Sequence, residues 1–153
     1  MRAKTLLTIL VAVAVALAVR SGCSRSGGGG SAGHAGGPGV RFASLSFEDA
    51  VSRAREERTL VLVDVYTDWC GWCKKLDKEV FADARVGEAT RGLVAIRVNA
   101  EKGGEEVASR FRVGGYPTLL FVDGDGNLVH RVEGYLPADE FLEVLRALPR
   151  KSA

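Results

Sequence analysis

The chain has 153 residues, of which 46% are hydrophobic and 26% are charged, a balance typical of one globular domain. Its formal net charge is +2, but the first 22 residues hold three basic side chains and no acidic one, so 18 basic and 19 acidic residues remain. This nearly neutral remainder contains no basic run, which argues against nucleic acid as a partner.

Residues 1–22 are predicted to be an export signal. Arg2 and Lys4 precede an uncharged, mostly apolar run of 15 residues, 5–19. As a helix this run would reach only about 22 Å, short of the ~30 Å hydrocarbon core of a bilayer. A signal peptide is therefore favoured over a spanning anchor, and the protein is expected in the periplasm or cell envelope.

The position at which this signal would be cut is open. Ala16-Leu17-Ala18 offers one cleavage site. Residues 21–23, Ser-Gly-Cys, resemble the end of a bacterial lipoprotein signal, in which the cysteine becomes the lipidated first residue. Arg20 departs from that pattern, because an apolar residue is usual there. Lipidation at Cys23, a soluble product and an uncleaved membrane anchor all remain as alternatives.

Residues 23–40 are predicted to be a flexible tether. Of the 16 residues 24–39, eight are glycine and three are serine, too few apolar groups to form a core. The root-mean-square reach of such a segment is roughly 20–24 Å, enough to hold a domain clear of a membrane. His34, inside it, is interpreted as a solvated linker residue.

The first half of the predicted domain, which extends over 41–150, begins with a helix and a strand. Ser46 and Asp49 form a capping-box-like pair, and apolar residues follow at helical spacing to about Arg58. Residues 59–66 are a β-branched apolar run interrupted only by Asp64, which predicts a strand buried on both faces. A second helix is expected to start near Cys70.

The second half alternates in the same way. It predicts a strand at 93–98, a short helix at 105–111, a hairpin of strands 118–123 and 128–133, and a last helix from 137 to 148. Residues 41–45 add a short first strand as an option. The alternation implies parallel strands joined by helices, with an antiparallel strand from the hairpin, in a mixed sheet of four or five strands with helices on both faces.

The pair Cys70 and Cys73 is the strongest chemical signal in the chain. Residues three apart in a helix have Cβ atoms ~5–6 Å apart, close to what a disulfide tolerates. If the helix starts here, its N-terminus would stabilise a thiolate on Cys70, which would attack a substrate disulfide and be released by Cys73. Half of a zinc site and a static structural disulfide are the alternatives.

Asp64 is the second unusual residue, because burial of a carboxylate raises its pKa and costs stability. Near the two thiols, such a group could take the proton of Cys73 and return it. The plainer alternative is that Asp64 lies at a strand end and is solvated.

No metal or cofactor is expected. A zinc site would need four ligands, but there is no second pair of close cysteines, and the two histidines are His34 in the linker and His130 in a strand. Residues 123–127, DGDGN, resemble the start of a calcium loop, but Leu128 and Gly134 stand where that loop requires glycine and glutamate. They are interpreted as a hairpin turn.

Three stretches, taken together, resemble a known family. They are VLVDVYTDWCGWCKK at 61–75, RVNAE at 97–101 and VGGYPTLLFVDGDG at 113–126. Over about residues 42–148 the chain thereby resembles the thioredoxin-like proteins, and among them the exported domains of the thiol:disulfide interchange type. The resemblance implies an α/β thioredoxin-like fold.

The resemblance also assigns roles to single residues. It implies that Cys70 is the attacking thiol, Cys73 the resolving thiol and Asp64 the buried acid of the strand before the motif. Pro117 matches a cis-proline facing the disulfide, and Tyr116 the residue whose backbone pairs with an extended substrate. Three further positions that would contact substrate are Trp69, Gly71 and Trp72.

Three positions depart from the family pattern. Gly71-Trp72 replaces the Gly-Pro of the commonest thioredoxin, and this pair tunes the redox potential. Arg97 stands where many members have a lysine near the buried acid, and arginine cannot serve as a titrating partner. Asp68, just before Trp69, would slightly oppose formation of a thiolate.

The sequence thus predicts an extracytoplasmic thiol-disulfide oxidoreductase that reduces envelope proteins through Cys70 and Cys73. Its partners would be protein disulfides and an upstream redox protein, with membrane attachment through a lipid or the leader. The alternative is a non-catalytic module that binds an extended peptide in the groove at Tyr116 and Pro117.

Overall fold

The computed structural model describes residues 38–149. The predicted signal peptide, most of the tether and Cys23 lie outside the described residues, as does position 150. The strands are β1 (Val61–Tyr66), β2 (Val94–Asn99), β3 (Thr118–Val122) and β4 (Leu128–Glu133). The helices are α2 (Phe47–Glu57), α3 (Gly71–Leu76), the π-helical turn η1 (Asp77–Phe81), α4 (Ala84–Ala89), α5 (Glu105–Arg110) and α6 (Ala138–Ala147).

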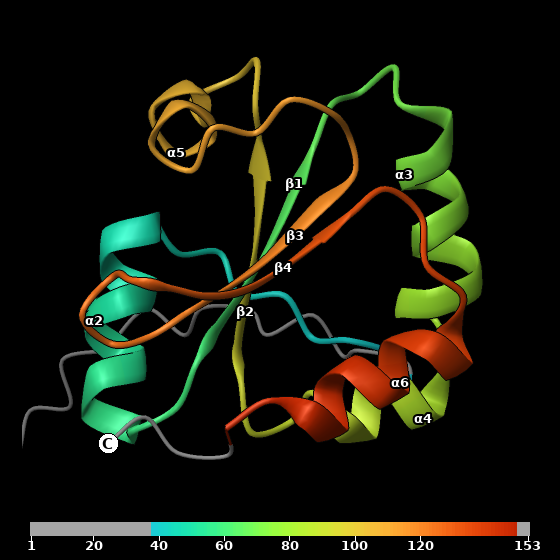
Figure 1. The fold of residues 1–153 in the computed structure, drawn as a ribbon, viewed down its shortest axis with the longest axis horizontal. Helices are drawn as coiled ribbons and strands as arrows, with labels where there is room; N and C mark the ends of the chain where they lie inside the picture. Colours follow the sequence, from blue (N-terminus) through green and yellow to red (C-terminus); the bar gives the residue numbers. More distant parts are fainter. Residues whose placement is uncertain (1–37, 150–153) are drawn as a thin grey trace, which may run out of the picture. The chain divides into compact units, whose positions relative to one another are not determined.

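The strands form one mixed sheet in the order β2-β1-β3-β4 (Figure 1). β1 and β2 are parallel, whereas β3 is antiparallel to both β1 and β4. The mixed sheet is confirmed, but the expectation of parallel strands was wrong for β3. Val65 of β1 pairs with both Val98 and Thr118, so the connection from β2 to β3 starts and ends at the same end of the sheet. The chain must therefore run back along β1.

Helices cover both faces of the sheet, as predicted. Figure 1 shows α2 and α5 on one side and α3, α4 and α6 on the other. Phe47 of α2 and Val107 of α5 belong to a core that includes Val63, while Leu76 of α3 and Phe141 of α6 belong to a second core on the opposite face. The two faces of β1 therefore belong to different cores.

Local signals account for where α2 begins and ends. The Ser46 hydroxyl accepts a hydrogen bond from the backbone N–H of Asp49 at 3.0 Å, which satisfies one free donor of the first turn. Arg58 adopts a left-handed conformation with φ 52° and ends the helix. The predicted capping pair is thus confirmed.

Two details differ from the expectation. The optional strand at 41–45 is reduced to a single bridge between Phe42 and Ala95, because only this point meets the edge of β2. The short helix α4 was not predicted, since its single buried large side chain, Val86, gives too weak a periodic signal. No helix within residues 38–149 is both long and apolar enough to cross a bilayer.

Candidate active site

The disulfide Cys70–Cys73 lies where β1 leads into α3. Cys70 occupies the N-cap position with an extended backbone, and its Sγ accepts a hydrogen bond from the backbone N–H of Cys73 at 3.0 Å. The Cα atoms of the two residues are 5.3 Å apart. Both side chains are almost fully buried, at 4% and 3% exposure. The predicted helix start at this motif is confirmed, and it aims a free N–H group at the Cys70 sulfur.

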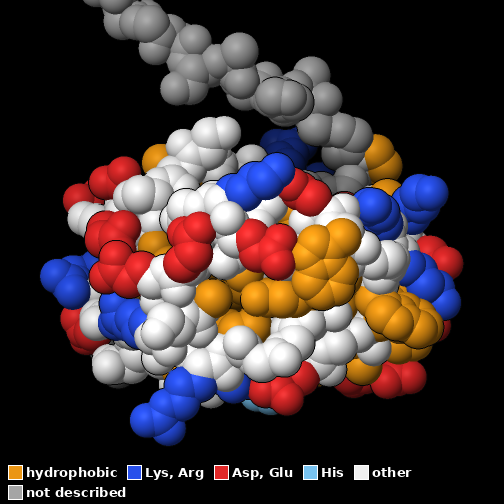
Figure 2. Space-filling view, turned by 90° about the horizontal axis from the view of Figure 1, so that it is seen from above, with side chains coloured by type: hydrophobic (Ala, Val, Ile, Leu, Met, Phe, Trp, Pro, Cys, Tyr) orange, Lys and Arg blue, Asp and Glu red, His pale blue; other side chains and the backbone are white. Residues whose placement is uncertain are grey.

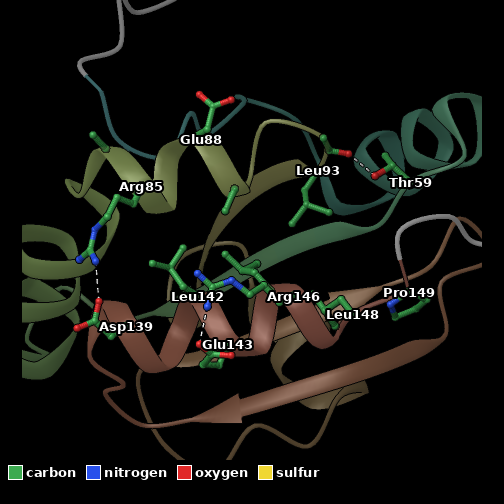
Figure 3. A pocket seen from close by; sticks show the side chains of 14 residues that line it. Thr59, Arg85, Glu88, Leu93, Asp139, Leu142, Glu143, Arg146, Leu148 and Pro149 are labelled. Atoms are coloured by element: carbon green, nitrogen blue, oxygen red, sulfur yellow. Dashed lines mark hydrogen bonds and ion pairs between the residues drawn. The ribbon is translucent and has the colours of Figure 1, made fainter.

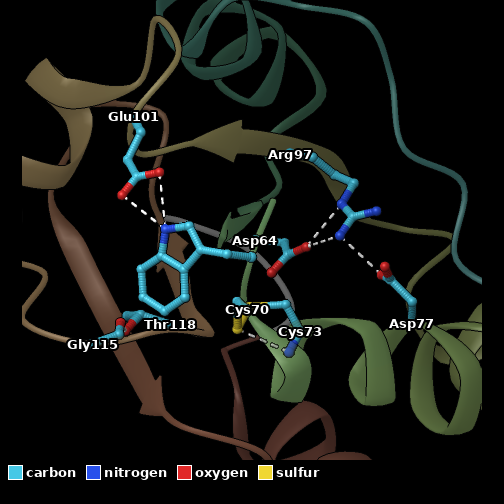
Figure 4. The surroundings of a disulfide bond; sticks show 9 residues. Asp64, Cys70, Cys73, Asp77, Arg97, Glu101, Gly115 and Thr118 are labelled. Carbon is cyan, nitrogen blue, oxygen red and sulfur yellow. Dashed lines mark hydrogen bonds and ion pairs between the residues drawn. A yellow bond between two sulfur atoms is a disulfide. The ribbon is translucent and has the colours of Figure 1, made fainter. Parts of the chain in front are cut away.

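Asp64 is buried in the sheet beneath the disulfide. Its side chain is 1% exposed, so the alternative of a solvated strand-end residue was wrong. It shares its face of β1 with Leu62, which belongs to the same core as Leu76 of α3. In Figure 4 its carboxyl group points between Arg97 and the disulfide. Its Oδ1 atom has no hydrogen-bond partner within the described structure.

Arg97 holds the other oxygen of Asp64. The two residues are direct neighbours in the parallel pairing of β1 and β2. Arg97 Nε donates a hydrogen bond to Asp64 Oδ2 at 2.9 Å, and Nη2 forms an ion pair with the same oxygen at 2.8 Å. The same Nη2 lies 2.9 Å from Asp77 Oδ1, so the guanidinium joins two carboxylates (Figure 4). It also packs over the Tyr66 ring, at 4.5 Å from the ring centroid.

These contacts act on the pKa of Asp64 in opposite directions. Burial, the largest effect, and the charge of Asp77 raise it, whereas Arg97 lowers it, and the resulting pKa is about 6. Asp64 is therefore a group that can hold or release a proton near neutral pH, next to a pair of thiols.

An aromatic pair lies beside Cys70 on the side of β2 and β3. The Trp69 side chain is 66% exposed, and its ring meets that of Tyr116 edge to face with centroids 6.0 Å apart. Glu101 accepts a hydrogen bond from Trp69 Nε1 with both carboxylate oxygens at 3.0 Å. These two hydrogen bonds, drawn at Glu101 in Figure 4, restrict the rotation of the indole.

A second aromatic pair lies on the side of α3. Trp72, 57% exposed, stacks at a tilt on Tyr135 with ring centroids 5.6 Å apart. The ammonium of Lys75 lies 5.2 Å from the Trp72 ring and 4.6 Å from the Tyr135 ring. Tyr135 donates a hydrogen bond to Glu79. The ring of Trp72 is thus held in place by Tyr135 and Lys75, and Glu79 in turn holds Tyr135.

The backbone around Pro117 has the form that the resemblance implied. The Tyr116–Pro117 peptide bond is cis, directly before β3. Gly71, the first residue of α3, has no atom within 4 Å of the position that a Cβ would take. An extended chain can therefore approach the disulfide between these two positions.

Neither metal hypothesis gains support in this part of the chain. The sulfurs of Cys70 and Cys73 bond to each other, so in this state they are not zinc ligands. Asp123 accepts hydrogen bonds from the backbone N–H groups of Asp125 and Asn127, which makes DGDGN the predicted hairpin turn. Within residues 38–149, no three His, Cys, Asp or Glu side chains are close enough to hold an ion.

A separate pocket of about 1000 Å³ lies between α4 and α6 (Figure 3). Thr59 and Leu93, which line it, precede β1 and β2, whereas the disulfide follows β1. The pocket is thus at the opposite end of the sheet, and none of the predicted site residues lines it.

Four residues of the site were not predicted as part of it. They are Asp77, Glu101, Lys75 and Tyr135. Asp77 had a usable signal, because it follows Cys70 by seven positions, about two helical turns, and so lies on the same side of the helix. The partners of Glu101 and Tyr135 are set by loop packing, which leaves no periodic trace.

Comparisons with known proteins agree with this geometry. The model of a family described as a thioredoxin-like domain matches residues 47–149. The chain is 33% identical, over 116 residues, to the thiol:disulfide interchange protein DsbD of Haemophilus influenzae, a match that covers 71% of the chain and 20% of that protein. The chain therefore spans about a fifth of the length of this curated relative.

Two solved structures extend the comparison. A provisionally assigned disulphide-isomerase from Bacteroides thetaiotaomicron is 40% identical with a TM-score of 0.64, over 73% of this chain and 94% of that one. A thioredoxin from Thermus thermophilus is 29% identical with a TM-score of 0.62, over 71% and 85%. The predicted fold class is thereby confirmed.

Proposed function

Since the chain belongs to the thioredoxin-like family of thiol-disulfide oxidoreductases, we propose that it works outside the cytoplasm and reduces disulfides of envelope proteins through a Cys70–Cys73 cycle. The observation that carries this proposal is the position of Cys70 at the N-cap of α3, with a backbone N–H directed at its sulfur. That donor stabilises the thiolate when the disulfide is reduced.

In the first step, the Cys70 thiolate attacks one sulfur of a substrate disulfide. A bond forms between the two proteins, and the second substrate sulfur leaves as a thiolate. The exposed side chains of Trp69 and Trp72, the open space at Gly71 and the backbone at Tyr116 and Pro117 would contact the extended substrate segment.

In the second step, Cys73 attacks Cys70 and releases the substrate. Asp64 takes the proton of Cys73, because its pKa of about 6 makes it a carboxylate at neutral pH. The bond between the proteins breaks, the substrate leaves with two thiols, and Cys70 and Cys73 are left as the disulfide seen in the structure. An upstream dithiol protein would then reduce them again.

The proposed location is supported by the sequence before the domain. A basic start, an apolar run of 15 residues and the small residues before Cys23 fit an exported protein held at a membrane by a lipid or by its leader. If Cys23 is lipidated, the protein should incorporate a labelled fatty acid, and the Cys23→Ser variant should not. A protein that is released from the membrane fraction and carries no label would contradict lipidation.

The proposal is tested by trapping the intermediate. A Cys73→Ser variant should form mixed disulfides with substrate proteins on Cys70, because the resolving thiol is missing. The control, Cys70→Ser, should form none and should lose all exchange with a model disulfide. If partners bind Cys70→Ser as tightly as the unchanged chain, and no exchange occurs, the protein is a peptide-binding module instead.

The direction of electron flow is tested by the reduction potential of the Cys70–Cys73 pair. A value close to about −270 mV, that of thioredoxin, supports a reductase. A value near about −120 mV would show an oxidant and contradict this part of the proposal.

A further inference from the structure

The two exposed tryptophans flank the disulfide, and each is paired with a tyrosine from a different part of the chain. Trp69 pairs with Tyr116, just before β3, and Trp72 pairs with Tyr135, between β4 and α6. We call these the Trp69 pair and the Trp72 pair. A segment that crosses the disulfide from one side to the other meets both pairs.

Each pair is in contact with a charged side chain, and the two charges have opposite signs. The carboxylate of Glu101 accepts the indole N–H of the Trp69 pair. The ammonium of Lys75 lies within 5.2 Å of both rings of the Trp72 pair. Glu79 lies 3.9 Å from Lys75 and also accepts a hydrogen bond from the Tyr135 hydroxyl, so it offsets part of the charge of Lys75.

The nearest ion pairs leave this difference in place. Beside the Trp69 pair, Lys102 is paired with Asp68, and within residues 38–149 Glu101 forms no ion pair. Beside the Trp72 pair, Lys75 has one carboxylate neighbour, Glu79, while Asp77 of η1 is engaged with Arg97. Figure 2 shows hydrophobic side chains gathered in the middle of one face, with acidic and basic side chains on both sides of them.

We propose that this polarity selects the substrate: the site takes extended segments whose cysteine has a basic residue on one side and an acidic residue on the other. The basic residue lies toward Glu101 and the acidic residue toward Lys75. Because pairing with the backbone at Tyr116 and Pro117 fixes the direction of the bound segment, only one order of the two charges along a peptide makes both contacts. The inference rests on the proposed thiol exchange and adds the class of segment that reacts fastest.

Charge complementarity is the physical basis. Each exposed charge pair contributes little and is screened by salt. With one order of charges, however, the segment forms two attractive contacts, and with the reverse order both contacts are between like charges and repel. The expected preference is therefore about three- to tenfold in rate at low ionic strength. It should fall toward equality at about 0.5 M salt, where screening acts within a few ångströms.

The test uses two isomeric peptides, Lys-Ala-Cys-Ala-Glu and Glu-Ala-Cys-Ala-Lys, with blocked ends. Each is joined through its cysteine to thionitrobenzoate, and each rate is divided by that of an uncharged analogue. The reduced full chain attacks the peptide sulfur, and coloured thionitrobenzoate leaves as a thiolate. Cys73 then attacks Cys70, and the peptide leaves as a second thiolate, so the two protein thiols become the disulfide.

The decisive variant is the exchange of charge between the two pairs, Glu101→Lys with Lys75→Glu, which should reverse the preference between isomers. The matched control, Arg53→Glu with Glu57→Arg, exchanges an exposed ion pair on α2 without changing the net charge and should keep it. Lys75→Met alone should roughly halve the logarithm of the preference.

Equal rates for the two isomers, or a preference that the exchanged charges do not reverse, would overturn the inference and leave the proposed exchange standing. Absence of thionitrobenzoate release from all three peptides would overturn both.

Discussion

The six residues of strand β1 alternate between its two faces, and the two faces differ in chemistry. Val61, Val63 and Val65 point into one hydrophobic core. Leu62 and Asp64 point into the other, where a carboxylate lies fully buried next to Arg97. Both faces are closed to water, yet only one keeps a charged group.

This difference separates the requirements of folding from those of chemistry. The valine face stabilises the domain by burial of apolar surface, at about 25 cal/mol for each Å². The Asp64 face carries a penalty, because a buried acid with a raised pKa is less stable as a carboxylate in the folded chain. In return, the face places a proton acceptor next to the thiols.

The largest expected effect on stability comes from two adjacent leucines of β3, which point to opposite faces. Leu120 packs in the valine-face core and pairs with Val63, while Leu119 packs in the other core and pairs with Asp64. Both are fully buried, so Leu119→Ala and Leu120→Ala should each lower the free energy of unfolding by about 3 kcal/mol.

Only Leu119→Ala should also lower the pKa of Asp64, because the cavity it leaves lets water approach the carboxyl. Urea unfolding gives the stabilities, and the pH dependence of exchange gives the pKa. An equal shift of the pH profile in Leu120→Ala would contradict the separation of the two faces.

The next effect is that of Asp64→Asn. The pKa of about 6 lies above the unfolded value of about 3.8, so the stabilisation that comes from proton binding is complete below about pH 4 and lost as the pH rises through 6. This loss of unfolding free energy is on the order of 3 kcal/mol at pH 7. The Asp64→Asn variant should be about 1–2 kcal/mol more stable than the unchanged chain at this pH. The gain is smaller than the loss because Arg97 no longer has Asp64 as a charged partner.

The same variant should slow the release of mixed disulfides at least about tenfold at pH 7, because the proton acceptor is gone. The free energy of unfolding is measured as a function of pH for the variant and for the unchanged chain. The contributions of the other carboxylates to the pH dependence cancel in the difference between the two. Lower stability of Asp64→Asn at pH 7 would contradict the penalty assigned to this face.

The smallest effect is expected from Asp77→Asn. The charge of Asp77 raises the pKa of Asp64 and its carboxylate shares Arg97, so its removal should move the pH profile of exchange to lower pH by less than about one unit. Asp139→Asn, a change of a side chain on α6 that is 83% exposed, serves as the control. A shift to higher pH would show that Asp77 acts on Asp64 in some other way.

Sequence reasoning predicted what is local. The cap at Ser46, the apolar run around Asp64 and the helix start at Cys70 each follow from a few adjacent residues, and the structure contains all three. The direction of β3 was missed because it depends on where a long connection ends. The contact of Arg97 with Asp77 was missed because it joins a strand to a helix far from it in sequence.

The short bridge at the start of the described chain has a consequence for solubility. Phe42 bridges to Ala95, and the N–H of Ala43 donates to the Ala95 carbonyl at 2.8 Å, so this segment covers the outer side of β2 at Ala95. An uncovered outer strand is a template on which other chains can stack and aggregate. The segment that leads into the domain thus also protects this part of the edge of β2. Truncation to Ser44 would expose the edge and is expected to promote self-association through β2.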